Sequence, residues 1–301
     1  MEDYYFKVAG FVFGITVPEG TDIEKLLPSF KPFRYCDTLK HEPLFMFNVH
    51  YGEFPGKQDS GYMFIDESLN DMGRVRLYSF SDGYYIRISF RNDEMEHCAV
   101  SDRSFKRTDA YINKDDRYAG DVVCSLLRMV YSQAIIPHGG ISVHASSVIL
   151  DGKAYLFMGK SGTGKSTHSA LWIKSFQGCE LMNDDNPTIL INNDIVMASG
   201  TPWSGKTPCY KDVMLPVGGI VRLKQAKFNI FSTCDGFQAF INMLSGCSVI
   251  RKDVTLQNEM HRTLALVAEL VTVGVMECLP DMDAAFVCRN GLEKKLSIKY
   301  R

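Results

Sequence analysis

The first 118 residues alternate between apolar or aromatic and polar side chains over short stretches, which is the pattern of β-strands. The most distinct pair, residues 74–80 and 84–90, flanks Ser81-Asp82-Gly83, and an Asp-Gly turn between alternating stretches favours a hairpin. Further apolar stretches cover 6–17 and 44–51. We therefore expect a β-rich accessory domain whose aromatic side chains pack within a sheet.

The period changes over residues 118–136, where apolar residues recur at the spacing of an α-helix. These residues are Val122, Val123, Leu126, Leu127, Val130, Tyr131 and Ala134. Pro137 follows, and proline is common beyond the end of a helix because it cannot continue one. We expect the domain boundary ahead of this helix, with an accessory domain over 1–118 and a second domain over 119–301.

In the second domain, apolar stretches at 141–150 and 154–158 flank an Asp151-Gly152 turn and predict a hairpin. Other strands are expected at 188–191, 195–198 and 215–223, and helices at 237–244, 254–270 and 282–290. Asp281 is the expected N-cap of the last helix, and Gly291 is the residue expected just past its end.

A glycine-rich loop follows the second arm of this hairpin, and a helical stretch follows the loop. The loop consists of Gly159, Lys160, Ser161, Gly162, Thr163, Gly164, Lys165 and Ser166. This is the G-x-x-x-x-G-K-[ST] pattern, in which backbone N–H groups surround phosphates, the lysine reaches the β- and γ-phosphates and the final hydroxyl ligates Mg²⁺. The segment is called the phosphate loop below, and it predicts binding of a nucleoside triphosphate.

Three further residues could take part in chemistry at this loop. His144 precedes it on the first arm of the hairpin, and Asp184 and Asp185 follow it after a short apolar segment. Phosphoryl transfer needs charge neutralisation and a base for the incoming hydroxyl. One aspartate could hold Mg²⁺ with Ser166 while the other accepts the proton. His144 approaches the loop only if the register of the hairpin permits it.

The composition narrows the choice of partners and compartment. The formal net charge of −2 gives no electrostatic reason to expect nucleic acid or an anionic membrane as a partner. No apolar stretch is long enough to span a membrane, and the N-terminus lacks the pattern of a signal peptide. The nine cysteines include no C-x-x-C pair, as expected for reduced thiols in a cytoplasmic protein.

The motifs together resemble the nucleotide core of the HPr kinase/phosphorylase and phosphoenolpyruvate carboxykinase superfamily. The resemblance rests on segments 143–147, 151–152, 159–167 and 183–185, and more weakly on 278–281. It implies an α/β fold that leans toward α+β, with a mixed-sheet nucleotide-binding core and a β-rich N-terminal domain. It also implies ATP and Mg²⁺ as cofactors.

The resemblance further implies roles for individual residues. Thr167 would join the phosphate loop in binding the nucleotide, and Lys165 would contact the β- and γ-phosphates. Asp185 would be the base toward the acceptor or a metal ligand, Asp184 would hold the metal through water, and His144 would contact the transferred phosphate or a second metal.

Two features depart from that superfamily. The Leu-Glu-Ile-Arg-Gly-like run of true HPr kinases is absent, and Trp203 and Lys206 occupy about that place as candidate substrate contacts. This argues against HPr itself as the substrate. The chain is also far shorter than a carboxykinase and lacks its arginine-bearing substrate site.

The sequence therefore predicts a kinase that phosphorylates a hydroxyl, such as a serine, on a peptide, protein or small molecule. Two alternatives remain open: a nucleotide-binding regulatory module without catalysis, and a small carboxykinase-like enzyme. The acceptor, the natural donor among ATP, GTP and pyrophosphate, and the oligomeric state, a homo-oligomer included, are also left open.

Overall fold

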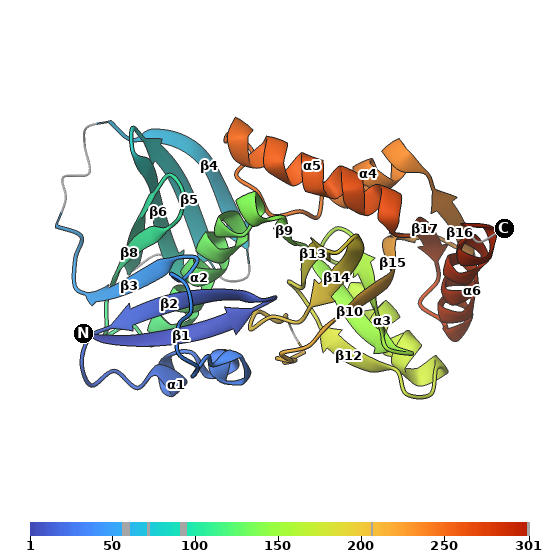
Figure 1. Ribbon diagram of the computed structural model, residues 1–301, viewed down its shortest axis with the longest axis horizontal. Coiled ribbons are helices and arrows are strands. Elements are labelled where there is room, and N and C mark those ends of the chain that lie inside the picture. Colours follow the sequence, from blue (N-terminus) through green and yellow to red (C-terminus); the bar gives the residue numbers. More distant parts are fainter. Residues whose placement is uncertain (56–60, 71–72, 91–94, 206, 300–301) are drawn as a thin grey trace. The chain divides into compact units, whose positions relative to one another are not determined.

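The computed structural model describes residues 1–55, 61–70, 73–90, 95–205 and 207–299. The chain is mixed α/β and divides into two compact units, Met1–Ile135 and Ile136–Arg301 (Figure 1). The sequence led us to expect the boundary before the helix α2 (Ala119–Ala134), but the two units divide after it. The reason is that α2 packs against strands of the first unit, so its apolar face belongs to that core.

The described part of the first unit forms one eight-stranded sheet in the order β1-β2-β3-β8-β7-β6-β5-β4. Its strands are β1 (Glu2–Val8), β2 (Phe11–Val17), β3 (Met46–Tyr51), β4 (Met63–Asn70), β5 (Gly73–Phe80), β6 (Gly83–Phe90), β7 (Glu96–Asp102) and β8 (Arg107–Ile112). A short helix α1 (Ile23–Leu26) and a 3₁₀ segment (Pro28–Phe33) follow β2. The expected hairpin is confirmed, because β5 and β6 pair antiparallel and Phe80 lies opposite Gly83.

Aromatic side chains pack inside the first unit, as the sequence predicted. Phe13 is fully buried and its ring lies 4.7 Å from that of Phe45 and 5.9 Å from that of Tyr131 on α2. Burying such rings contributes about 2 kcal/mol each through the hydrophobic effect. The sheet and α2 are therefore held together by one aromatic core.

The second unit contains a mixed sheet in the order β12-β10-β11-β15-β14-β13-β9, with β17 paired to β15 and β16 paired to β17. Its strands are β9 (Gly140–Ser142), β10 (Ala145–Leu150), β11 (Lys153–Met158), β12 (Glu180–Asn183), β13 (Thr188–Asn192), β14 (Ile195–Ser199), β15 (Met214–Gln225), β16 (Ile230–Cys234) and β17 (Val273–Cys278). Its helices are α3 (Lys165–Ser175), α4 (Gly236–Leu244), α5 (Val254–Leu270) and α6 (Met282–Lys299), and a 3₁₀ turn covers Ile136–His138.

The strand that leads into the phosphate loop is one arm of a hairpin, as predicted. β11 pairs antiparallel with β10 and parallel with β15. The expected strand over 141–150 is nevertheless two strands, because its backbone changes partners at Val143 and His144. The Val143 amide donates to the Pro187 carbonyl and the His144 amide donates to the Gly246 carbonyl. His144 thus lies in a short break directly before β10.

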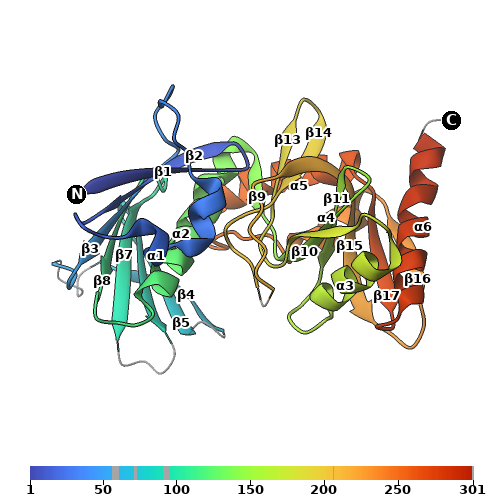
Figure 2. The ribbon, with the colours of Figure 1, turned by 90° about the horizontal axis from the view of Figure 1, so that it is seen from below.

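One apolar core joins α3 and α6 to the central strands of the second sheet. Figure 2 shows the two helices beside these strands. Trp172 of α3 is fully buried in it beside Phe157 of β11. The last helix begins as expected, since the Asp281 carboxylate accepts a hydrogen bond from the Ala284 amide. It does not end at Gly291, however, and continues to Lys299.

No helix in the described part of the chain is long and apolar enough to cross a membrane.

Candidate functional site

The phosphate loop connects the end of β11 to the start of α3. Gly162 and Gly164 have φ values of +77° and +102°, which only glycine adopts without strain. The Lys160 carbonyl accepts hydrogen bonds from both the amide and the hydroxyl of Thr163, at 3.1 and 2.5 Å. These contacts form a tight turn whose shape comes from the loop itself.

Gly164 is the N-cap of α3, and a glycine offers no side chain to the free N–H groups of the first helical turn. Such N–H groups, with the partial positive charge of the helix terminus, bind phosphate. Ser166 and Thr167 lie in this first turn and are exposed. The loop and the start of α3 therefore combine free N–H groups with exposed hydroxyl side chains, which are groups that can bind an anion.

Lys165 contacts both the loop and His144. Its ammonium lies 2.9 Å from His144 Nε2 and 3.3 Å from the Gly159 carbonyl oxygen. Burial lowers the pKa of Lys165, and the charges of Asp185 and Asp184 oppose this shift. The lysine is thus a half-buried cation beside two carboxylates.

His144 connects Lys165 to Asp185, because its Nδ1 lies 3.0 Å from Asp185 Oδ1. A lysine ammonium can only donate, so Nε2 accepts from Lys165 and Nδ1 carries the proton donated to the carboxylate. The contact follows from the hairpin register: Ala145 lies opposite Met158, so His144 reaches the level of Gly159. The structure therefore joins Asp185, His144 and Lys165 into one hydrogen-bonded chain.

Asp184 lies in a buried polar network below the loop. Its side chain is 5% exposed, and its Oδ1 accepts a hydrogen bond of 2.7 Å from the Ser146 hydroxyl. The Ser146 and Ser169 hydroxyls are 2.6 Å apart, which connects Asp184 to α3. Asp184 Oδ2 is buried and has no hydrogen-bond partner among the residues that the structure describes. A buried carboxylate oxygen without a partner is costly unless a ligand completes it.

Asn183 positions the acidic pair. Its side-chain carbonyl accepts from the amides of Asp185 and Asn186, at 3.1 and 2.8 Å, and its side-chain amide donates to the carbonyls of Thr201 and Trp203. Sequence reasoning assigned no role to Asn183, although an asparagine two residues before a turn is a recognised signal for such bonds. For Ser146 and Ser169 the sequence holds no such signal, since nothing local relates them to Asp184.

Of the two candidate substrate contacts, Trp203 is buried and only 4% exposed, and its backbone bonds to Asn183 and Thr201. Its loop does approach the acidic pair, because a Cβ on Gly205 would come within 2.9 Å of the Asp184 carbonyl oxygen. Lys206 lies outside the described residues, so both assignments stay predictions.

The described residues include no group of three or more His, Cys, Asp or Glu side chains that could hold a metal ion by themselves. Mg²⁺ bound with a nucleotide commonly uses only one or two carboxylates and takes its other ligands from phosphates and water. Asp184 Oδ2 and the exposed Ser166 hydroxyl fit that limited protein contribution. The residues present are thus compatible with a nucleotide-bound Mg²⁺.

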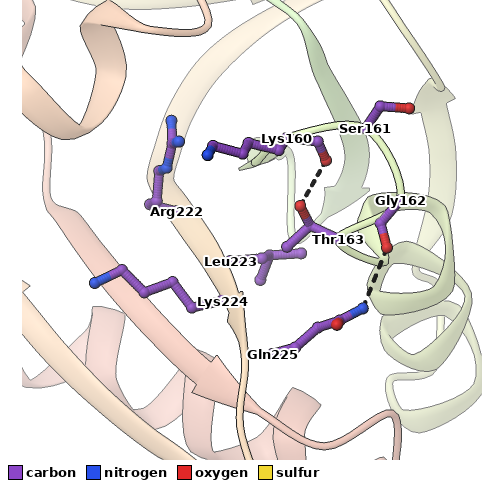
Figure 3. A pocket seen from close by; sticks show the side chains of 8 residues that line it. All are labelled: Lys160, Ser161, Gly162, Thr163, Arg222, Leu223, Lys224 and Gln225. Carbon is purple, nitrogen blue, oxygen red and sulfur yellow. Dashed lines mark hydrogen bonds between the residues drawn. The ribbon is translucent and has the colours of Figure 1, made fainter.

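A pocket of about 420 Å³ adjoins the outer side of the phosphate loop (Figure 3). Its lining consists of Lys160, Ser161, Gly162, Thr163, Arg222, Leu223, Lys224 and Gln225. The Gln225 side-chain amide donates to the Gly162 carbonyl at 3.2 Å and joins the end of β15 to the loop.

Comparison with known proteins gives little further information. No protein-family model and no curated protein matches the chain. Among solved structures, it is similar to the Hpr(Ser) kinase/phosphatase from Coxiella burnetii, with 13% sequence identity, a TM-score of 0.32, and coverage of 52% of this chain and 98% of that one. A TM-score this low supports no conclusion about fold or function, so the site has to be interpreted from its own geometry.

Proposed function

We propose that this protein is a kinase that binds ATP and Mg²⁺ at the phosphate loop and transfers the γ-phosphoryl group to a hydroxyl of a peptide, protein or small molecule. The observation that carries the proposal is the hydrogen-bonded chain Asp185–His144–Lys165 at the phosphate loop. It combines a carboxylate that can take a proton with a cation that can stabilise phosphate charge, and phosphoryl transfer needs both.

In the proposed reaction, the acceptor hydroxyl oxygen forms a bond to the γ-phosphorus while the bond from that phosphorus to the β,γ-bridging oxygen breaks. Asp185 accepts the hydroxyl proton, and His144 holds its carboxylate through Nδ1. Lys165 stabilises the negative charge that collects on the bridging oxygen and the β-phosphate. The Ser146 and Ser169 hydroxyls fix Asp184 relative to α3.

When bound, Mg²⁺ neutralises phosphate charge and orients the phosphates for in-line transfer. Asp184 and Ser166 would hold it. We further propose that the second unit has the mixed-sheet core of the HPr kinase and carboxykinase kind. The support comes from this chain alone. One arm of a hairpin leads into the phosphate loop, a histidine precedes the loop in the sequence, and an acidic pair follows the loop.

The test is transfer of labelled γ-phosphate from ATP to the protein and metabolite pools of a fractionated cell extract. We expect Asp185→Asn to slow transfer by about 10²- to 10⁴-fold, the usual contribution of a general base. ATP binding, measured by calorimetry, should persist in this variant. Lys165→Ala should lose both ATP binding and transfer.

Asp194→Asn is the matched control, because Asp194 is an exposed carboxylate in the turn between β13 and β14. Transfer at the normal rate by Asp185→Asn would show that the assigned base is wrong. A wild-type protein that binds ATP but forms no ADP with any pool would favour the regulatory binding module. Transfer to a small carboxylic acid with loss of CO₂ would favour a carboxykinase-like enzyme.

A further inference from the structure

Four neighbouring strands of the second sheet have one of their ends on the side of the phosphate loop. β11 and β15 are parallel, so their carboxyl ends lie together. β10 is antiparallel to β11 and β12 is antiparallel to β10, so the start of β10 and the end of β12 lie on the same side as the carboxyl ends of β11 and β15. Along these strand ends lie, in order, Asp185 after β12, His144 before β10, the phosphate loop after β11, and the last residues of β15. Open α/β sheets commonly bind ligands outside the carboxyl ends of their strands.

The two sides of the phosphate loop differ in chemistry. On the β10 and β12 side are Asp185 and His144, and Lys165 turns toward them. On the β15 side is the 420 Å³ pocket, whose described lining has three cations, Lys160, Arg222 and Lys224, and no carboxylate. The proposed phosphoryl transfer takes place on the first side, so the leaving part of the donor must extend toward the second.

Arg222 is fixed in the wall of this pocket. It lies opposite Met158 in the parallel pairing of β15 with β11, which places it next to the start of the loop. Its guanidinium donates to the Asn242 carbonyl at 3.2 Å and to the Ser245 hydroxyl at the end of α4. Its charge also contributes to the lowered pKa of Lys165, so the two cations are close enough to interact electrostatically. Figure 3 shows the Lys160 side chain extending from the loop toward Arg222 on β15.

We infer that the pocket on β15 is the subsite for the nucleoside and α-phosphate of the donor, with Arg222, Lys224 and Gln225 as its recognition residues. The inference rests on the proposed kinase function and adds the orientation in which the donor binds. The donor lies across the loop with its nucleoside on β15 and its γ-phosphate at Lys165, and the acceptor enters from the side of Asp185. A planar guanidinium can stack on a base, and an amide can bond to its edge. The donor is accordingly a nucleotide and not pyrophosphate.

The test compares Mg²⁺–ATP with Mg²⁺–tripolyphosphate, which has the same phosphate chain without a nucleoside. Both affinities are measured by calorimetry on the full chain. Arg222→Lys and Gln225→Ala keep the charge of the pocket. We expect each to weaken ATP binding about tenfold, as for the loss of one good contact, and to leave tripolyphosphate binding within about twofold. Gln238→Ala, at an exposed position of α4, is the matched control and should change neither affinity.

The ratio of the two affinities within one variant is insensitive to a fraction of unfolded protein. Equal weakening of both ligands would overturn the inference, because the residues would then hold phosphates only. Unchanged ATP binding in both variants would also overturn it and place the nucleoside elsewhere. A wild-type chain that binds tripolyphosphate as tightly as ATP would refute the subsite as well. If the wild type binds neither ligand, the proposed function itself fails, which is a separate result.

Discussion

Asn183 and Ser146 show how single side chains build this site. Asn183 uses its carbonyl oxygen for the amides that follow it and its amide group for the loop that contains Trp203. Ser146 bonds the Asp184 carboxylate from the neighbouring strand. Each side chain is fully buried, so its hydrogen bonds are shielded from competing water. The acidic pair is therefore held in place before any ligand arrives.

His168 makes stability depend on pH. Burial lowers its pKa to about 4, and it accepts a hydrogen bond from the Trp172 indole at 3.1 Å. An unfolded histidine titrates near about 6.5, so between these values the unfolded chain binds the extra proton and the native state loses stability as the pH falls. From about pH 7.5 to about pH 4.5 the loss should be about 2.5 kcal/mol.

This contribution can be isolated with His168→Gln, which keeps an acceptor for Trp172 but cannot titrate. Urea unfolding at several pH values should give the wild type a steeper loss of unfolding free energy below about pH 6.5 than the variant has. Parallel profiles for the two proteins would mean that His168 is not kept neutral by burial.

At the scale of elements, the last helix shows how packing overrides a local signal. Gly291 has the residue type of a helix end, yet α6 continues through it. A Cβ at this position would lie 2.2 Å from Phe231 Cδ1 and 2.9 Å from Phe231 Cβ on β16. The glycine is thus needed for close approach of helix and strand, which the sequence could not reveal because Phe231 is distant along the chain.

Gly291→Ala should consequently destabilise the protein by about 1–3 kcal/mol through overpacking, although alanine favours helices over glycine. Gly236→Ala in α4 is the control, because a Cβ there would meet no described atom within 4 Å apart from its chain neighbours and the nearby backbone of its own helix. The control should be neutral or more stable by up to about 1 kcal/mol. Thermal unfolding of both variants gives the comparison, and a Gly291→Ala protein as stable as wild type would contradict the close contact.

At the scale of the whole molecule, the chain has two compact units with separate cores. All residues assigned to the proposed site and its nucleoside subsite lie in the second unit, Ile136–Arg301. The first unit contains the aromatic sheet core around Phe13. Because each unit is compact by itself, the two units should unfold as separate cooperative transitions.

Scanning calorimetry can assign these transitions. Phe13→Ala should destabilise one transition by about 3–5 kcal/mol. Mg²⁺–ATP at about 100 times its dissociation constant should stabilise the other by about 2.7 kcal/mol. If the substitution and the nucleotide move the same transition, the two units do not unfold independently.

The sequence by itself determined the elements that depend on neighbouring residues. The hairpin of residues 74–80 and 84–90, the helix over 254–270 and the phosphate loop were all predicted, because turn residues, periodicity and glycine placement act within a few positions of the chain. It also indicated which residues to consider at the site, including His144 and the acidic pair, but not whether they meet.

Only the tertiary structure decided the contacts between segments far apart in sequence. The register of β10 and β11 brought His144 to Lys165, and the return of β12 to β10 brought Asp185 to His144. The break before β10, the two buried serines and the Arg222 pocket also depend on partners that periodicity does not encode. The physical reason is that these positions are fixed by hydrogen bonding and packing across the sheet, where the partner of each residue is set by the fold and not by its neighbours in the chain.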